Sequence, residues 1–230
     1  MRTICRLALV AATLAPAVAS AQLPVSTGIT TTGPTGALRD TRWQISYRQE
    51  LPTPPAPPTA FEDAYVITSP PGAWQSPVGF RWVGASFSAG VPNGQGDGQR
   101  RFTYFLRTAF SLDAGDQLTL RMQCSFDNYW VGMFINGAQF GGAVCGPDNT
   151  FAFPPEFVVG PAAFQGGNNT LEFRWQGDGI TDGIAVRVNS SVVVPGPPVN
   201  VVPEPSTYAL LATGMAGLLG VARRRRSSRV

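Results

Sequence analysis

The side chains of this sequence that could do chemistry are carboxylates and a few thiols, because the chain contains no histidine. That absence excludes a Ser-His-Asp or Cys-His catalytic arrangement and a His-ligated zinc site. It leaves open a glycoside hydrolase, which needs only two carboxyl groups, about 5–5.5 Å apart in retaining enzymes and about 6.5–9.5 Å apart in inverting ones. The acids available for such a pair are Asp97, Asp113, Asp116, Asp127, Asp148, Glu156, Glu172, Asp178 and Asp182.

Most of these acids lie in glycine-rich or turn contexts, where the usual role of an aspartate is to cap a surface turn. Asp178 and Asp182 could offer oxygen ligands to Ca²⁺, although segment 177–183 does not match the calcium loop of an EF-hand. A structural calcium ion is therefore the only cofactor that we consider. The sequence predicts no catalytic residue and no other metal site.

Two cysteines, Cys124 and Cys145, lie in the central part of the chain, whereas Cys5 lies in a segment that we expect to be removed. An even pair of cysteines in an oxidising compartment favours a disulfide. Closing a loop of about twenty residues would stabilise the fold by roughly 3 kcal/mol in the chain-entropy model. The alternative is a reactive thiol, but the chain has neither histidine nor lysine to lower a thiol pKa. We predict a Cys124–Cys145 disulfide.

Exposed aromatic side chains could stack on sugar rings, which makes them candidates for a binding site. The aromatic residues considered are Trp74, Trp82, Tyr129, Trp130 and Trp175. Alternation along the strands assigns about half of them to the core, and aromatic residues are more often buried than exposed. Trp130 is the strongest candidate because it follows Asp127, Asn128 and Tyr129 at the start of an expected strand. Asp127, Asn128 and Trp130 are therefore the candidate ligand-binding residues, although core packing is the commoner role for an aromatic residue such as Trp130.

The elements that must position these residues are expected to be strands. The 26 glycines, 21 prolines and 14 phenylalanines favour short strands joined by many turns over a helical bundle. Strands are predicted at 41–48, 64–68, 80–87, 101–110, 116–124, 129–135, 139–144, 169–175 and 184–194.

Alternation within these runs indicates one buried and one exposed face for each strand. Asn136-Gly137, between two apolar runs, predicts a hairpin because both residues tolerate a positive φ. About nine strands at this spacing predict an all-β fold, a two-sheet antiparallel sandwich with an aromatic core. Helices are expected only in the N-terminal signal and the C-terminal tail.

The order of several short motifs resembles that of galactose-binding-like jelly rolls. The motifs are, in order, Phe110-Ser111-Leu112, Leu118-Thr119-Leu120, Asp127-Asn128, Phe134-Ile135-Asn136-Gly137 and Asn168-Asn169-Thr170-Leu171-Glu172-Phe173. In that family a Val-Asn-Gly hairpin and an Asn-x-Leu strand recur, and Ile135-Asn136-Gly137 and Asn169-Thr170-Leu171 resemble them. The resemblance covers residues 100–194 and implies a jelly-roll sandwich. Because many members of that fold are structural, it implies sugar binding only faintly.

The N-terminal 21 residues have the three parts of a secretory signal. Arginines at positions 2 and 6 are followed by an apolar run over 7–18 and by small residues that include Ala19 and Ala21. Cleavage after Ala21 would leave Gln22 as the first residue, so the partners implied are the Sec machinery and signal peptidase. An uncleaved anchor helix is the alternative, but the run is short for a membrane span.

At the other end, Pro203, Glu204, Pro205 and Ser206 precede sixteen mostly apolar residues, 207–222, and the cluster Arg223, Arg224, Arg225 and Arg226. The prolines keep the junction extended, and the arginines would hold the far end of the helix in the cytoplasm as a membrane stop. This arrangement resembles the PEP-CTERM sorting signal. The resemblance implies transient single-pass insertion in the inner membrane and processing by an exosortase, a membrane protease of Gram-negative bacteria that make exopolysaccharide. A plain C-terminal anchor is the alternative.

The positive charges are concentrated in these two end segments. Between residues 22 and 202 ten arginines face thirteen acids, so that the central part carries a net charge near −3. A nucleic-acid surface would need its cations on the folded body, and nucleic acid is therefore excluded as a partner.

The predicted organisation is a signal peptide at 1–21, a flexible segment at 22–40, a sandwich domain at 41–194, a proline-rich linker at 195–202 and a sorting tail at 203–230. We expect a non-enzymatic protein of the cell surface or extracellular matrix whose role is structural, adhesive or carbohydrate-binding, with polysaccharide as its partner in biofilm. The alternatives are a two-carboxylate glycoside hydrolase and a purely structural matrix protein without a ligand.

Overall fold

The computed structural model describes residues 23–34, 37–49, 58–75, 77–89, 102–143, 145–146, 151–197, 210 and 213–218. The chain divides into two units, Met1–Pro195 and Gly196–Val230. In the second unit, residues 210 and 213–218 are helical. Within the described ranges, no helix has the length and apolar character needed to cross a bilayer. The predicted signal peptide, the sorting motif residues and the arginine cluster lie outside the described residues.

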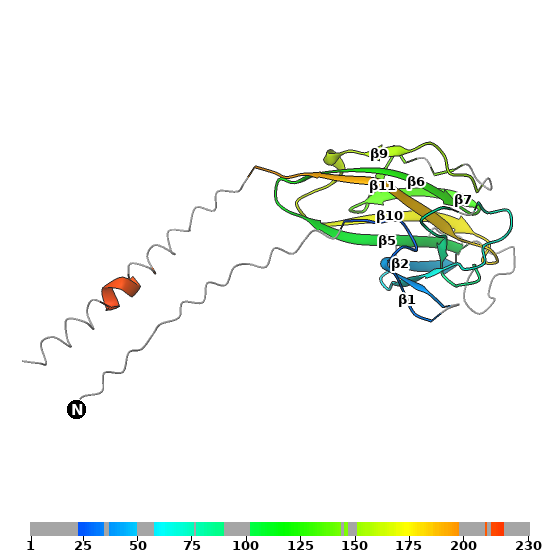
Figure 1. Cartoon of the computed structure of the whole chain (residues 1–230), viewed down its shortest axis with the longest axis horizontal. Coiled ribbons are helices and arrows are strands. Elements are labelled where there is room, and N and C mark those ends of the chain that lie inside the picture. Colours follow the sequence, from blue (N-terminus) through cyan, green and yellow to red (C-terminus); the bar gives the residue numbers. More distant parts are fainter. Residues whose placement is uncertain are drawn as a thin grey trace, which may run out of the picture. The chain divides into compact units, whose positions relative to one another are not determined.

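The first unit is built from strands (Figure 1). They are β1 (Thr31–Thr32), β2 (Arg39–Gln49), β3 (Glu62–Val66), β4 (Val83–Gly84), β5 (Phe102–Leu112), β6 (Gln117–Phe126), β7 (Tyr129–Ile135), β8 (Ala138–Phe140), β9 (Phe157–Val159), β10 (Gly167–Gly177) and β11 (Ile184–Val194). One short 3-10 helix, η2 (Pro161–Ala163), follows β9. All the strand pairings are antiparallel.

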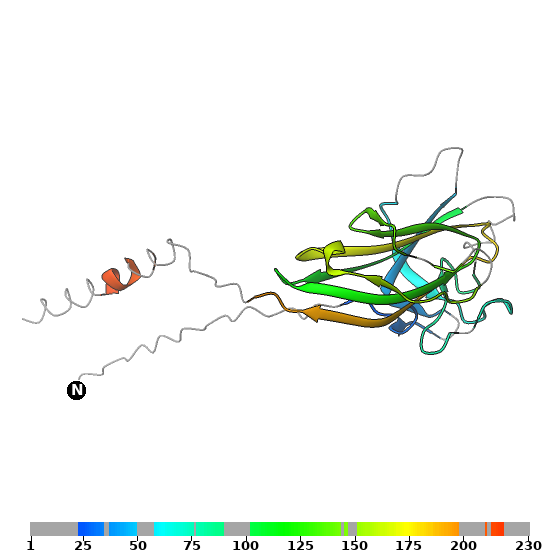
Figure 2. The same cartoon turned by 90° about the horizontal axis from the view of Figure 1, so that it is seen from above.

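Hydrogen bonds link the strands in the order β8-β7-β10-β5-β2-β3-β4-β11-β6-β9, with β1 added beside β2. The sheet curls so that β11, β6 and β9 form a layer facing β10, β5 and β2 (Figures 1 and 2). The predicted all-β antiparallel fold is therefore confirmed, with one difference. The two layers are joined through β3 and β4 and make one curled sheet. The galactose-binding-like jelly roll stays a prediction.

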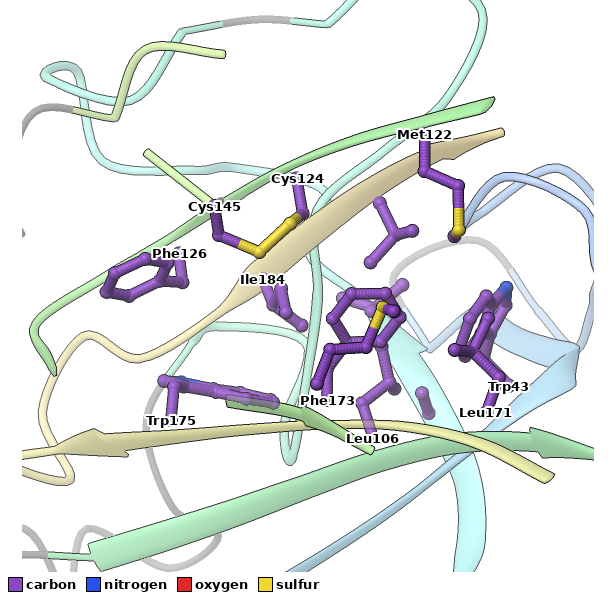
Figure 3. Close-up of a cluster of buried hydrophobic side chains, with 14 of the residues drawn as sticks. Trp43, Leu106, Met122, Cys124, Phe126, Cys145, Leu171, Phe173, Trp175 and Ile184 are labelled. Carbon is purple, nitrogen blue, oxygen red and sulfur yellow. A yellow bond between two sulfur atoms is a disulfide. The ribbon is translucent and has the colours of Figure 1, made fainter. Parts of the chain in front are cut away.

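An aromatic core fills the space between the layers. Alternate residues of the long strands point inward, as in β6, where Leu118, Leu120 and Met122 are fully buried. Figure 3 shows Met122 and Cys124 of one layer above Leu106 and Phe173 of the other. Each large apolar side chain buried in this way stabilises the fold by about 1.5–3 kcal/mol.

The hairpin predicted at Asn136-Gly137 joins β7 to β8. Asn136 has φ 51° and Gly137 has φ 82°, the positive values that a tight two-residue turn requires. Ile135 pairs with Ala138 across it. The Asn136 side chain also accepts a hydrogen bond from the Thr170 backbone N–H at 2.8 Å, which ties the turn to β10.

The strand predicted at 80–87 is much shorter in the structure, where only β4 forms. The aromatic residues around it make a second cluster, in which the Trp74 and Trp82 rings lie 4.3 Å apart and Phe80 meets Phe153 edge-on at 5.1 Å. Ala185 of β11 lies in the same cluster. The apolar residues at 80–87 are therefore buried because they pack against the outer face of β11. Most of them do not pair with a neighbouring strand.

One further predicted strand is shorter in the structure, and two strands of the structure were not predicted. The strand predicted at 139–144 ends at residue 140, since β8 has three residues. The short strands β1 and β9 were not predicted. β9 is a three-residue strand preceded by Pro154-Pro155 and followed by Gly160-Pro161, which hide it in a turn-rich stretch.

The segment predicted to be flexible, 22–40, is partly built into the sandwich. Residues 23–27 lie between β2 and β11. The indole N–H of Trp43 donates to the Val25 carbonyl at 2.8 Å, and the Thr27 N–H donates to the Val186 carbonyl at 2.9 Å. The Val188 N–H donates to Ser26 Oγ at 2.8 Å. These bonds extend the folded body toward the N-terminus, beyond the predicted boundary at residue 41.

Candidate functional site

Four of the residues predicted to bind a ligand or calcium meet at one end of the sandwich. Asp127 and Asn128 form the turn between β6 and β7, and Asp178 and Asp182 lie in the turn between β10 and β11. Asn128 Nδ2 donates to Asp182 Oδ1 at 2.7 Å. The Asp127 backbone N–H donates to the carbonyl of Gly183 at 3.0 Å. The two turns thus form one hydrogen-bonded unit, which we call the acid network.

Asp182 is the centre of the acid network and is fully buried. Its Oδ1 accepts from Asn128 Nδ2 and from the Asp178 backbone N–H at 3.2 Å. Its Oδ2 accepts from the Tyr104 hydroxyl at 2.7 Å and from the Gly179 backbone N–H at 2.5 Å. Hydrogen-bond donors within the protein therefore replace the water that an exposed carboxylate would have.

Burial changes the protonation of this network. Burial, with the negative charges of Asp182 and Asp178, raises the pKa of Asp127 to about 7. Burial also raises the pKa of Asp182, against the opposing effect of its hydrogen-bond donors. Burial and the nearby Asp182 raise the pKa of Tyr104, which keeps its hydroxyl a donor. With a pKa of about 7, Asp127 is partly protonated near neutral pH.

A glycine makes room for the buried carboxylate. A Cβ added to Gly177, the last residue of β10, would overlap the Asp182 carboxyl group. Asn128 has φ 79°, which asparagine tolerates better than most residues. Both features show that the local sequence is adapted to place Asp182 inside the fold.

The burial of the acid network limits the ligands that it could bind. Asp127 and Asp182 are 4% and 0% exposed, and neither lines the cleft at residues 28–29 and 67–82 or the cleft at residues 45–47 and 60–62. In the same residues no group of three acidic, cysteine or histidine side chains is arranged for a metal ion. The calcium site at Asp178 and Asp182 stays a prediction. The geometry fits a polar clamp that joins two turns.

Trp130 packs toward the core. Its ring is half-buried and stacks on Phe126 with centroids 5.3 Å apart, and it lies 6.2 Å from the ring of Phe173. The neighbouring Tyr129 is 49% exposed. The other tryptophans considered for sugar stacking, Trp74, Trp82 and Trp175, are all buried.

Cys124 and Cys145 form a disulfide, drawn in Figure 3, with Cα atoms 4.7 Å apart. Both cysteines are buried. The bridge closes the loop that contains β7 and β8, and Cys124 pairs with Val186 of β11. The disulfide therefore supports the middle of the sandwich, close to the acid network.

An open cleft that sequence reasoning missed lies between residues 28–29 and 67–82. Its volume is about 500 Å³, and Phe80, Arg81 and Trp82 are among the residues that line it. The Arg81 N–H donates to the Thr27 carbonyl at 2.9 Å, and Thr27 Oγ1 donates to the Arg81 carbonyl at 2.6 Å. A Cβ on Gly28 would lie 2.6 Å from the Cβ of Arg81, so only glycine fits there. These contacts fix the backbone of Arg81 beside the cleft.

Comparison with known proteins gives one match, at the C-terminal end of the chain. Residues 201–226 match the PEP-CTERM protein-sorting motif. No curated protein and no solved structure matches the chain. The matched range includes Pro203, Glu204, Pro205 and Ser206 and also the arginines at 223–226. The chain thus carries a PEP-CTERM protein-sorting motif, the signal of an exported protein that an exosortase processes at the membrane.

Proposed function

We propose that this protein is a non-enzymatic component of the bacterial cell surface or extracellular polysaccharide matrix. The observation that carries the proposal is the sorting motif at residues 201–226. A disulfide-bonded body supports it, because disulfides persist in oxidising compartments outside the cytoplasm. The net negative charge of the central part argues against binding to nucleic acid.

A non-enzymatic role is supported by the chemistry of the side chains. The chain has no histidine, and the acids Asp127 and Asp182 are buried and bonded to other groups of the protein. A glycoside hydrolase needs both carboxyl groups at a surface that a sugar chain can reach. The hydrolase alternative would therefore require another acid pair, and release of reducing sugar from bacterial polysaccharide by the purified protein would support it.

Processing at the sorting motif tests the proposal directly. Mass spectrometry of the protein from culture medium and from the cell envelope should give a mature form that lacks residues 1–21 and the arginines at 223–226. Replacing Glu204 and Pro205 by alanine should leave the tail attached, whereas replacing Ser227 and Ser228 by alanine should not. Intact tails on most molecules of the unaltered protein would refute the proposal.

Carbohydrate binding is a second candidate, favoured by the cleft beside Arg81. Its volume of about 500 Å³ lies in the range of about 300–1,000 Å³ that is usual for small-ligand sites. Phe80 and Trp82 supply apolar walls, and the exposed Arg81 supplies hydrogen-bond donors. On a glycan array, Arg81→Ala should lose binding and Arg121→Ala, at another exposed position, should keep it. No binding to any sugar would favour the purely structural alternative.

A further inference from the structure

The second half of β11 is paired on one side only. Residues 190–194 pair with β6, from Ser190 beside Arg121 to Val194 beside Gln117. On the other side, β4 meets β11 at Ile184, and Ser26 and Thr27 reach only as far as Val188. Among the residues that the structure describes, none makes a backbone hydrogen bond to that side of residues 189–194. Figure 2 shows β11 (orange) along one border of the body.

This open edge lacks the features that protect edges in other proteins. It reads Asn189-Ser190-Ser191-Val192-Val193-Val194, without charge or proline before Pro195. Native edge strands are usually kept short or carry lysine, proline or an inward-pointing charge. The two ends of the sheet, β8 and β9, follow that rule because each has three residues. The end of β11 is longer, and Val192 and Val194 are 53% and 56% exposed.

We propose that residues 189–194 pair with the same residues of a second copy of this chain, in antiparallel register about a two-fold axis. The unpaired N–H and C=O groups of both copies would then bond to each other, and the sheet would continue from one molecule into the next. Identical strands suit this pairing because a two-fold axis brings the same surface of both copies together. The strands carry no charge that would repel.

The segment that reaches Val188, residues 23–26, is a poor occupant of the same edge. The segment beside Val188 continues backward to Val25, Pro24 and Leu23, and proline has no N–H to donate. The Leu23 and Val25 carbonyls already accept bonds from Arg42 and Trp43. If the signal is cleaved after Ala21, only Gln22 precedes this segment. The pairing does not depend on the function proposed above.

Sedimentation of the full chain in detergent micelles tests the pairing. Val192→Lys with Val194→Lys adds positive charges to the paired strands of both copies, close to the two-fold axis, and should weaken association at least about tenfold. Val78→Lys with Ile180→Lys adds the same charge at positions 90% and 51% exposed, away from the edge, and should leave association unchanged. Any association through the tail is common to all these proteins. A monomer at every concentration, or equal association of the two variants, would overturn the proposal.

Oxidative cross-linking gives a second readout that does not depend on added charge. Single cysteines at 190, 191, 192 and 193, in a Cys5→Ser background, should give a cross-linked dimer at the positions next to the two-fold axis. Val78→Cys in the same background is the exposed control and should not cross-link. Absence of dimer at all four edge positions, with thiols that react with a soluble maleimide, would also overturn the proposal.

Discussion

The two halves of β11 have similar residues in different surroundings. Ile184, Ala185 and Val186 are fully buried, and neighbours bond to both sides of the strand through β6, β4 and Thr27. Val192, Val193 and Val194 are exposed or half-buried and have a neighbour on one side. Valine therefore lies in the core in the first half of β11 and on an unpaired strand edge in the second half. Neighbours contributed by distant parts of the chain decide between the two.

The acid network lies directly before the first half of β11 and holds it in place. Breaking this network should have the largest effect on stability. Asp182→Ala would leave its donors without an acceptor, and each buried donor left unpaired costs about 1–3 kcal/mol. We expect a loss of at least about 3 kcal/mol in urea unfolding. Asp113→Ala, at an exposed turn, should change stability by less than about 0.5 kcal/mol, and an equal loss in both would show that the network contributes nothing special.

The disulfide supports the same half of β11 from β6. Replacing Cys124 and Cys145 together by alanine should cost about 3 kcal/mol, because the bridge closes a loop with a separation of 21 residues. Reducing agent should lower the stability of the unaltered protein by a similar free energy, which appears as a lower midpoint of thermal unfolding. It should leave the midpoint of the double variant unchanged. A double variant as stable as the parent would mean that the bridge is dispensable for folding.

The pH dependence of stability should report on Asp127. Its pKa is about 7 in the folded protein and about 3.9 in an unfolded chain, so the folded state binds the proton more tightly. Stability should therefore fall as pH rises from about 4 to about 7, by roughly 1 kcal/mol per pH unit, and level off above. Asp127→Asn should flatten this part of the profile. Parallel profiles for the two proteins would contradict a raised pKa.

A matched pair of substitutions sharpens the comparison within β11 itself. Val186→Ala removes buried methyl groups and should cost about 1–3 kcal/mol, whereas Val192→Ala should cost less than about 0.5 kcal/mol. Thermal unfolding of dilute samples measures both without self-association. Equal losses would mean that the end of β11 is covered within one molecule.

Much of the strand pattern could be predicted from the sequence because it depends on local features. β7 and β11 match their predicted ranges, and the Asn136-Gly137 turn forms where two residues that tolerate positive φ meet. The alternation in β5 and β6 follows directly from the period of a strand. The disulfide was predictable because no other cysteine remains in the central part of the chain.

The candidate site was less predictable because its contacts are not local. Asp182 lies in a glycine-rich turn, where a surface cap is the usual role, yet it is buried because Tyr104, 78 residues earlier, donates to it. Trp130 follows a turn that suggests exposure, but Phe126 and Phe173 cover its ring. The cleft beside Arg81 depends on Thr27, which is 54 residues away in sequence. The two residues of each of these long-range contacts are too far apart to occur in one short stretch of sequence.

Residues 23–27 connect the earliest part of the described chain with its last strand. Thr27 and Val186 are 159 residues apart, and contacts that distant are slow to form because a long loop must close first. In a chain that emerges N-terminus first, residues 23–27 therefore cannot make these contacts, and Trp43 stays uncovered, until β11 has emerged. A product truncated before residue 184 would lack this final closure. We expect such a product to be incompletely folded and therefore sensitive to proteolysis.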